Sequence, residues 1–291
     1  MPVSVVTGAT GGLGYAVAKG LAKAGHHVVV TGRSKEHGAD ALARLRAEAP
    51  GAELEFQLCD VSSLEAVAAF AAAWGSRPLD VLVNNAGVMA FPQRQTTVDG
   101  FERQLGTNYL GHFALTLRLL SALLRTERPR VVSVSSLAHR SGQIQFDDLH
   151  LERNYDPMRA YRQSKLAMLM FARELQRRVD QHGWPLLSVA AHPGWSATRI
   201  VLNGMGQGLR ERFIQAGFNL VAQSADAGAM PMLHAALDPD VAPGCYYGPS
   251  RWDERRGPVA PSKVMGQGRD DAAASRLWAV SEQLTGVKLP S

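Results

Sequence analysis

The sequence predicts an α/β fold in which one parallel sheet of about seven strands, in the order 3-2-1-4-5-6-7, lies between helices on both faces. The main observation is that short, continuously apolar runs alternate with helical segments over the first two-thirds of the chain. Such runs are typical of strands covered on both faces. Right-handed crossovers between parallel strands then give a doubly wound, single-domain architecture.

The predicted strands are short runs dominated by branched apolar residues and bounded by turn residues. They lie at residues 3–7, 28–31, 54–59, 81–84, 130–135, 186–191 and 244–247. The predicted helices carry apolar residues at helical spacing, such as Val17, Leu21 and Ala24, or stop at breakers such as Pro50 and Gly51. They lie at residues 13–24, 36–48, 64–74, 100–124, 158–179, 224–237 and 271–284.

The composition excludes several classes of protein. Of the 291 residues, 46% are hydrophobic and 20% are charged, which is typical of a globular protein. The net charge of +5 comes from scattered Lys and Arg residues, without the basic stripe that a nucleic-acid partner requires. Cys59 and Cys245 form no C-x-x-C pair, and the histidines show no ligand spacing, so no metal site is expected. Without a signal or membrane-anchor pattern, the expected location is cytoplasmic.

Residues 7–14, TGATGGLG, follow a strand and open a helix, which is the context in which a glycine-rich turn binds a dinucleotide pyrophosphate. Gly8 permits the tight turn, Gly12 lets the backbone approach the phosphates, and Gly14 lets the helix pack on the strand. Thr10 and Leu13 belong to the same loop and are also expected to contact the cofactor.

The end of the second predicted strand indicates which dinucleotide is bound. An acidic residue there holds the ribose 2′-hydroxyl of NAD, whereas this chain has Gly32 followed by Arg33. A guanidinium can bind a 2′-phosphate with paired hydrogen bonds, and a carboxylate would repel it. The sequence therefore favours NADP(H) over NAD(H), the alternative being that Arg33 is a solvated loop charge.

The spacing T-G-x-x-x-G-x-G resembles that of the short-chain dehydrogenase/reductase family, whose other landmarks recur here in order. The resemblance implies a Rossmann-type fold and further cofactor contacts at Asp60, Val61, Asn85, Ala86, Gly87, Pro193, Gly194 and Thr198. It implies that the catalytic residues are Asn108, Ser136, Tyr161 and Lys165. In the family pattern Asn108 anchors a water that links Lys165 to solvent, and Tyr161 and Lys165 also contact the cofactor.

Tyr161 and Lys165 have a physical rationale of their own. A spacing of four residues places both on one helix face. A nearby ammonium favours the phenolate and lowers a tyrosine pKa that is otherwise near 10. In a carbonyl reduction Tyr161 supplies the proton while Ser136 holds the carbonyl oxygen. Ser136 is preferred to Ser135 because the family pattern places the catalytic serine second.

The long segment between Ser136 and Tyr161 and the sequence YxxSKLA resemble the retinol-dehydrogenase-like subgroup. This resemblance implies an NADP(H)-dependent oxidoreductase acting on the carbonyl or alcohol of an apolar small molecule. The alternatives are a tailoring ketoreductase of secondary metabolism and a non-catalytic NADP(H)-binding sensor.

The resemblance also implies a homodimer or homotetramer in which the helices bearing Asn108 and Tyr161 pair across a two-fold axis. The apolar residues of these helices could make that contact or could equally face the sheet: Leu110, Phe113, Leu117, Leu120, Met168 and Phe171.

One domain is expected to span residues 1–291. Residues 1–194 would form the cofactor-binding and catalytic core, residues 195–240 a substrate flap with a helix, and residues 241–291 the last strand and C-terminal helix. Several apolar residues of the flap could line a substrate pocket or could be ordinary packing: Trp195, Met205, Phe213 and Phe218. His192 could line the cofactor site or lie in the core.

Overall fold

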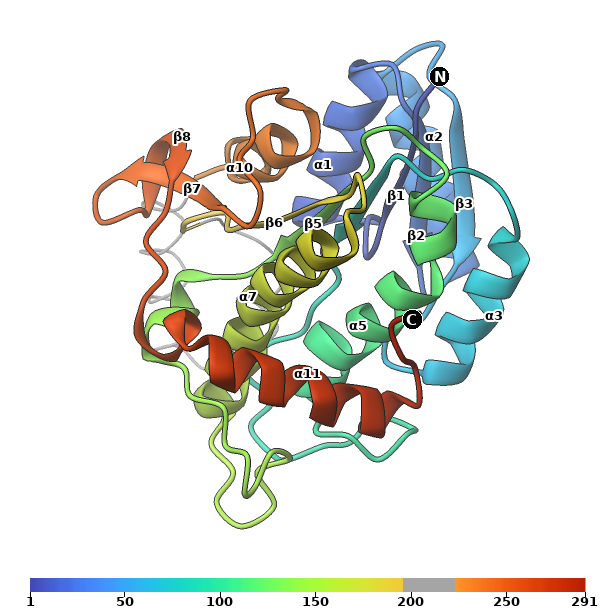
Figure 1. Ribbon diagram of the computed structural model, residues 1–291. Helices are drawn as coiled ribbons and strands as arrows, with labels where there is room; N and C mark the ends of the chain where they lie inside the picture. Colours follow the sequence, from blue (N-terminus) through green and yellow to red (C-terminus); the bar gives the residue numbers. More distant parts are fainter. Residues whose placement is uncertain (196–222, 291) are drawn as a thin grey trace, which may run out of the picture.

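The central sheet has the strand order β3-β2-β1-β4-β5-β6-β7-β8 in the computed structural model, which describes residues 1–195 and 223–290 (Figure 1). The first seven strands are parallel and follow the predicted order, so the doubly wound fold is confirmed. The strands are β1 (Val3–Val6), β2 (His27–Gly32), β3 (Leu54–Leu58), β4 (Val81–Asn84), β5 (Arg130–Val134), β6 (Leu187–Ala191), β7 (Tyr246–Arg251) and β8 (Arg256–Pro261).

Helices cover both faces of the sheet because successive strand residues point to opposite sides and are apolar on both. Within the described residues the helices are α1 (Gly12–Lys23), α2 (Lys35–Glu48), α3 (Leu64–Trp74), α4 (Arg103–Leu105), α5 (Gly111–Arg118), α6 (Leu120–Leu123), α7 (Pro157–His182), α10 (Ala225–Leu237) and α11 (Asp271–Thr285). Val6 and Val132 face the core under α1, α2 and α10. Val5 and Val131 face the core under α3, α5, α7 and α11.

Local sequence signals set most helix ends. The side chains of Ser34, Ser63 and Asp156 each accept a hydrogen bond from a backbone N–H in the first turn of the following helix. Pro157 starts α7, and Gly183, with φ of 64°, ends it in the left-handed conformation. These helices therefore begin and end within a few residues of the predicted positions.

The long helix predicted over residues 100–124 is broken into pieces. Its first turn begins at Arg103, because the buried Glu102 carboxylate accepts hydrogen bonds from the backbone N–H groups of Gln104 and Leu105. A π-helical turn, η1 (Gly106–Leu110), follows α4 and leads into α5. Such turns are rare and often occur at functional sites, and this one contains Asn108.

The sheet has an eighth strand that the sequence did not predict. β8 pairs antiparallel with β7, and residues 252–254 at the tip of this hairpin all have positive φ values, from 52° to 62°. Pro258 and Pro261 lie within β8, where they are tolerated because β8 is the outermost described strand on this side.

Part of the predicted substrate flap belongs to the helical layer. Residues 225–237 form α10, in which Ala229, Met232 and Ala235 are fully buried against the sheet. Met205, Phe213 and Phe218 lie outside the described residues. Over the described ranges, 1–195 and 223–290, no helix combines the length and apolar character needed to cross a bilayer.

The apolar residues of α5 and α7 are covered by the chain's own C-terminal helix. Figure 1 shows α11 lying across α5 and α7. The Trp278 ring stacks on Phe171 at 5.8 Å between centroids and meets Phe113 edge-on at 5.0 Å. The six apolar residues that could have made a subunit contact or faced the sheet are buried in this core, as the second alternative predicts: Leu110, Phe113, Leu117, Leu120, Met168 and Phe171.

Candidate active site

The glycine-rich loop after β1 has the geometry that the sequence predicts. Gly8 and Gly12 have φ values of 63° and 57°, in the left-handed region that favours glycine. A Cβ on Gly14 would lie 2.4 Å from Asn85 Nδ2 and 2.6 Å from the Gly8 carbonyl oxygen, so the helix could not pack this closely with any other residue. No side chain caps the N-terminus of α1, so its backbone N–H groups are available for a phosphate.

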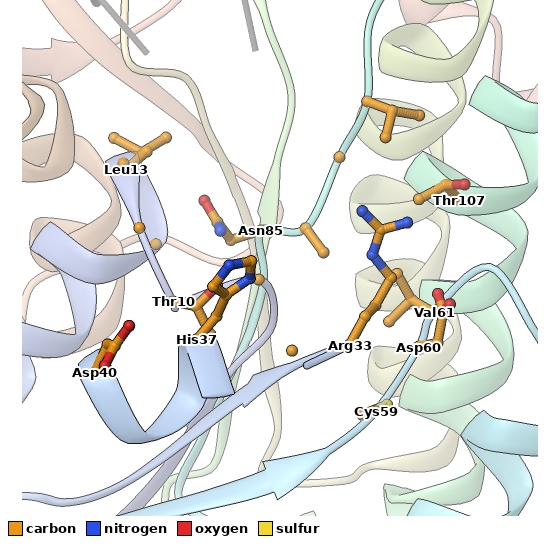
Figure 2. A pocket seen from close by; sticks show the side chains of 18 of the residues that line it. Thr10, Leu13, Arg33, His37, Asp40, Cys59, Asp60, Val61, Asn85 and Thr107 are labelled. Carbon is orange, nitrogen blue, oxygen red and sulfur yellow. The ribbon is translucent and has the colours of Figure 1, made fainter. Parts of the chain in front are cut away.

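A cavity of about 910 Å³ opens at this loop, along the carboxyl ends of the parallel strands (Figure 2). Its walls include most residues proposed to bind the cofactor: Gly8, Thr10, Gly12, Leu13, Gly14, Arg33, Asp60, Val61, Asn85, Ala86 and Gly87. The hydroxyl of Thr107, another wall residue, is buried and has no hydrogen-bond partner among the described residues. The volume, the glycine cradle and this unpartnered hydroxyl fit a bound dinucleotide.

Two arginines, Arg33 and Arg44, and two aspartates, Asp40 and Asp60, line the cavity. Figure 2 shows Arg33 extending from the end of β2 toward Val61 and Thr107. His37 and Arg44 of α2 line the same cavity, and Arg44 donates a hydrogen bond of 3.0 Å to the carbonyl oxygen of Thr10. The sequence analysis missed these two residues, although their spacing of seven puts them on one helix face.

Thr7 fixes the loop after β4 against the loop after β1. Its hydroxyl accepts hydrogen bonds from the backbone N–H groups of Asn85, at 2.8 Å, and Ala86, at 2.9 Å. The Asn85 side chain donates to the Thr7 carbonyl oxygen at 2.7 Å. Because both loops line the cavity, this junction determines the shape of its wall.

The structure brings Ser136, Tyr161 and Lys165 together beside the cavity. The Tyr161 hydroxyl is hydrogen-bonded to Ser136. Lys165 Nζ lies 5.9 Å from the centre of the Tyr161 ring. Lys165 Nζ is also close to the cavity wall. A Cβ built on Gly87, which lines the cavity, would lie 3.6 Å from this nitrogen. Ser135 points elsewhere and donates a 2.7 Å hydrogen bond to the Lys165 carbonyl oxygen.

The electrostatics of this group differ from the expectation that Lys165 lowers the pKa of Tyr161. Burial raises the pKa of Tyr161, and its hydrogen bond with Ser136 offsets only part of that increase. Burial also lowers the pKa of Lys165 to about 8. Lys165 Nζ donates a 3.0 Å hydrogen bond to the Val134 carbonyl oxygen instead of approaching the phenol oxygen directly.

Asn108 connects the loop after β4 to α7. Its side-chain oxygen accepts from Val88 N at 2.7 Å, and its amide donates to Val88 O and to Ser164 Oγ, each at 2.9 Å. Its main-chain carbonyl oxygen lies 3.0 Å from Nδ1 of His112.

The residues after β6 lie at the same edge of the sheet. Gly194 has a φ of 63°, and a Cβ there would lie 2.3 Å from the carbonyl oxygen of Arg255 at the β7–β8 hairpin. Pro193 precedes it, and Thr198 lies outside the described residues. His192 is fully buried, with Nε2 at 2.9 Å from Ser262 Oγ, so it lies in the core.

Two further residues near the cavity were missed. A Cβ on Gly111 would lie 1.8 Å from the carbonyl oxygen of Val61, so α5 approaches the loop after β3 where only glycine fits. His112 is fully buried next to Thr7 and Asn108. The pattern Asn108-x-x-Gly111-His112 could have singled out both residues in the sequence. Where their side chains lie, however, depends on the π-helical turn η1, which the pattern does not predict.

Comparison with known proteins gives consistent similarities along the whole chain. A family model described as short chain dehydrogenase matches residues 2–205. Mouse polyprenol dehydrogenase is 40% identical over 294 residues, covering 98% of this chain and 84% of that protein. Mouse retinol dehydrogenase 12 is 36% identical over 292 residues, covering 98% and 87%. The crystal structure of an uncharacterized protein from Mycobacterium paratuberculosis aligns with a TM-score of 0.83 and 39% identity, covering 100% of this chain and 96% of that one.

Proposed function

This chain belongs to the short-chain dehydrogenase family, and we propose that it is an NADP(H)-dependent oxidoreductase of apolar carbonyl compounds or the corresponding alcohols. Its membership makes it an oxidoreductase of alcohols or carbonyls that uses a nicotinamide dinucleotide. The observation that carries the finer proposal is the meeting of Ser136, Tyr161 and Lys165 beside the dinucleotide-sized cavity.

The choice of NADP(H) rests on charge. The loop after β1 would hold the pyrophosphate, and Arg33 would bind the 2′-phosphate with charge-assisted hydrogen bonds. Among the other cavity residues, Arg44 adds positive charge, and Asp40 and Asp60 add negative charge. Bound at this edge of the sheet, a nicotinamide dinucleotide supplies or accepts the hydride.

The chain's own residues would handle the proton. Ser136 Oγ can donate a hydrogen bond to the substrate oxygen, placing it next to the Tyr161 hydroxyl. Tyr161 then transfers its proton to that oxygen during reduction, or removes it during oxidation. Because burial raises the pKa of Tyr161, its neutral form is favoured, as a proton donor requires. Lys165 would stabilise the phenolate that remains through its positive charge, since its Nζ lies 5.9 Å from the centre of the Tyr161 ring.

The proposed substrate class follows from relatives named for retinol and polyprenol, both apolar alcohols, at 36% and 40% identity. We therefore propose an apolar substrate for this chain as well. Most of the expected substrate flap, residues 196–222, lies outside the described part of the chain.

The proposal is tested by measuring NADPH oxidation with a series of apolar aldehydes, including retinaldehyde, in wild type and Tyr161→Phe. We expect turnover in wild type and a loss of about 10²-fold or more in the variant, because the proton donor is gone. NADPH binding, measured by fluorescence, should be retained in the variant.

Tyr247→Phe is the matched control, because Tyr247 is also a buried tyrosine, but its hydroxyl contacts Ala242 N and the Cys245 side chain and not Ser136. It should keep turnover near that of wild type. Unchanged turnover in Tyr161→Phe would overturn the mechanism. Tight NADPH binding by wild type without turnover of any carbonyl would instead favour a cofactor-binding sensor.

A further inference from the structure

His112 lies between the loop that would bind the cofactor and the helix that carries Asn108. It is fully buried in the first turn of α5, and the mechanism above does not use it. Its Nε2 is 2.9 Å from the Thr7 hydroxyl, and its Nδ1 is 3.0 Å from the Asn108 carbonyl oxygen. One side chain therefore joins residues that are 101 positions apart along the chain.

The hydrogen bonds of Thr7 determine which nitrogen of His112 carries the proton. The Thr7 hydroxyl has two acceptor lone pairs and one proton. The backbone N–H groups of Asn85 and Ala86 occupy both lone pairs. The Thr7 proton must then go to His112 Nε2 at 2.9 Å or to the Val83 carbonyl oxygen at 3.3 Å, and the shorter distance favours His112.

His112 Nε2 is therefore an acceptor, and the neutral ring carries its proton on Nδ1. That Nδ1–H donates to the Asn108 carbonyl oxygen, which can only accept. A doubly protonated ring would place a second proton against a Thr7 oxygen with no free lone pair. Consistently, burial lowers the pKa of His112 to about 4.

The chain of hydrogen bonds thus runs from Asn85 and Ala86 through Thr7 and His112 to Asn108. Its first members line the proposed cofactor cavity. Its last member bonds through its side chain to Val88 and to Ser164, the neighbour of Lys165. The Asn108 carbonyl lies in the π-helical turn, where the regular helical hydrogen-bond pattern is interrupted.

We propose that His112 is a positioning residue whose neutral Nδ1–H tautomer couples the geometry of the cofactor loops to that of the Asn108 turn. The catalytic part of this proposal rests on the proposed oxidoreductase function. The tautomer and its effect on dinucleotide binding do not depend on turnover. The two ring nitrogens have separate tasks: Nε2 maintains the Thr7 junction, and Nδ1 maintains the Asn108 turn.

Two conservative variants separate these tasks. In His112→Asn the side-chain amide reaches only the position of Nδ1, so the bond to Asn108 can be kept while that to Thr7 is lost. In His112→Gln the amide reaches the position of Nε2, so the reverse holds. We expect the Asn variant to raise the NADPH dissociation constant about two- to tenfold, the range expected for one neutral hydrogen bond.

The Gln variant should keep NADPH affinity within about twofold but lower kcat about two- to tenfold and shift its pH profile, because the Asn108 turn beside Ser164 and Lys165 relaxes. A purely structural His112 would not produce this split between binding and kcat. Nitrogen-15 NMR of histidine-labelled wild type should show a protonated Nδ1 and an unprotonated Nε2 for His112.

His26 provides the control, because it is also buried and hydrogen-bonded to a hydroxyl, Ser4 Oγ at 2.7 Å, but away from the described cavity. His26→Asn and His26→Gln should leave both NADPH affinity and the kcat pH profile as in wild type. Equal effects of the two His112 variants on both quantities would overturn the proposal, as would a protonated Nε2. If wild type shows no turnover, the proposed function fails, while NADPH titration and NMR still decide the role of His112.

Discussion

The proposed preference for NADP(H) over NAD(H) depends mainly on one side chain, Arg33, at the end of β2. Its side chain lines the cavity, together with four residues of α2 that the sequence did not identify: His37, Asp40, Ala43 and Arg44. A 2′-phosphate here would pair with the positive charge of Arg33, whereas the 2′-hydroxyl of NAD carries no charge to pair with it.

Arg33→Gln should therefore raise the dissociation constant of NADPH about ten- to hundredfold, as expected for loss of a hydrogen bond to a charged group. The dissociation constant of NADH should change by less than about threefold. Fluorescence titration with both dinucleotides measures the two constants. Arg46→Gln, at an exposed position of α2, is the control and should change neither. Equal weakening of NADPH and NADH would show that Arg33 does not contact the 2′-phosphate.

Motif residues adjacent to strand ends were predictable from sequence, but residues that act through the packing of helices were not. Gly8, Asn85 and Gly87 follow strands, and the parallel topology alone brings them to one edge of the sheet. The role of His112 depends on how the π-helical turn η1 orients the faces of α5. The hydrophobic pattern of the sequence indicates neither η1 nor that orientation. The sequence also did not indicate that the Lys165 side chain points toward the Val134 carbonyl oxygen.

At the level of elements, the broken helix from α4 to α6 contributes to the cavity wall, because Thr107 of η1 lines the cavity. Glu102 sets its start, η1 changes its register, and Gly111 lets it approach the carbonyl of Val61. Val61 lines the cavity, so this close approach fixes one wall.

Gly111→Ala should lower the free energy of unfolding by about 1–3 kcal/mol, because the added methyl would overlap the main-chain oxygen of Val61 and force a backbone shift. Urea denaturation measures the change. Gly11→Ala is the control, since a Cβ there meets no atom within 4 Å and its φ of −173° suits any residue. The control should change stability by less than about 1 kcal/mol. A Gly111 variant as stable as wild type would mean that α5 can move away from Val61 at no cost.

The fold itself was largely predictable, since the seven parallel strands produce clear apolar runs. β8 was not, because Gly257, Pro258 and Pro261 are residues that strands usually avoid. Its existence depends on the partner strand β7 and on contacts made by the hairpin tip, which are tertiary interactions.

On the scale of the whole molecule, the β7–β8 hairpin links the last strands to the segments that follow β5 and β6. Arg140, four residues after Ser136, pairs with Asp253 at 2.7 Å and with Glu254 at 2.9 Å. The Trp195 backbone N–H donates to the Arg255 carbonyl oxygen at 2.8 Å. Burial alone would raise the pKa of Glu254, but hydrogen bonds from His192, the Lys263 backbone and Arg140 lower it to about 2.

Arg140→Met should lower the free energy of unfolding at pH 7 by about 1–3 kcal/mol, between the values for exposed and buried pairs. Because the pKa of Glu254 is depressed in the folded state, its stabilising effect is present above its unfolded pKa and is lost as pH falls toward 2. The difference between wild type and variant should therefore shrink from pH 5 to pH 2 in urea denaturation.

Arg153→Met is the control for this pair, because Arg153 lies 3.8 Å from Asp148 and its side chain is 69% exposed. It should cost much less stability than Arg140→Met at pH 7. A difference between wild type and Arg140→Met that stays constant from pH 7 to pH 2 would show that the ion pair does not carry the stabilisation.

The position of α11 has a consequence for how the chain acquires its structure during synthesis. Trp278 of α11 packs on the buried rings of Phe113 and Phe171, and a hydrogen bond joins the buried Tyr109 to Ser281 of the same helix. A ribosome delivers residues 271–285 only after every strand of the sheet has been made. This aromatic face must remain uncovered on the nascent polypeptide until then, which makes it the surface where a chaperone would be needed most.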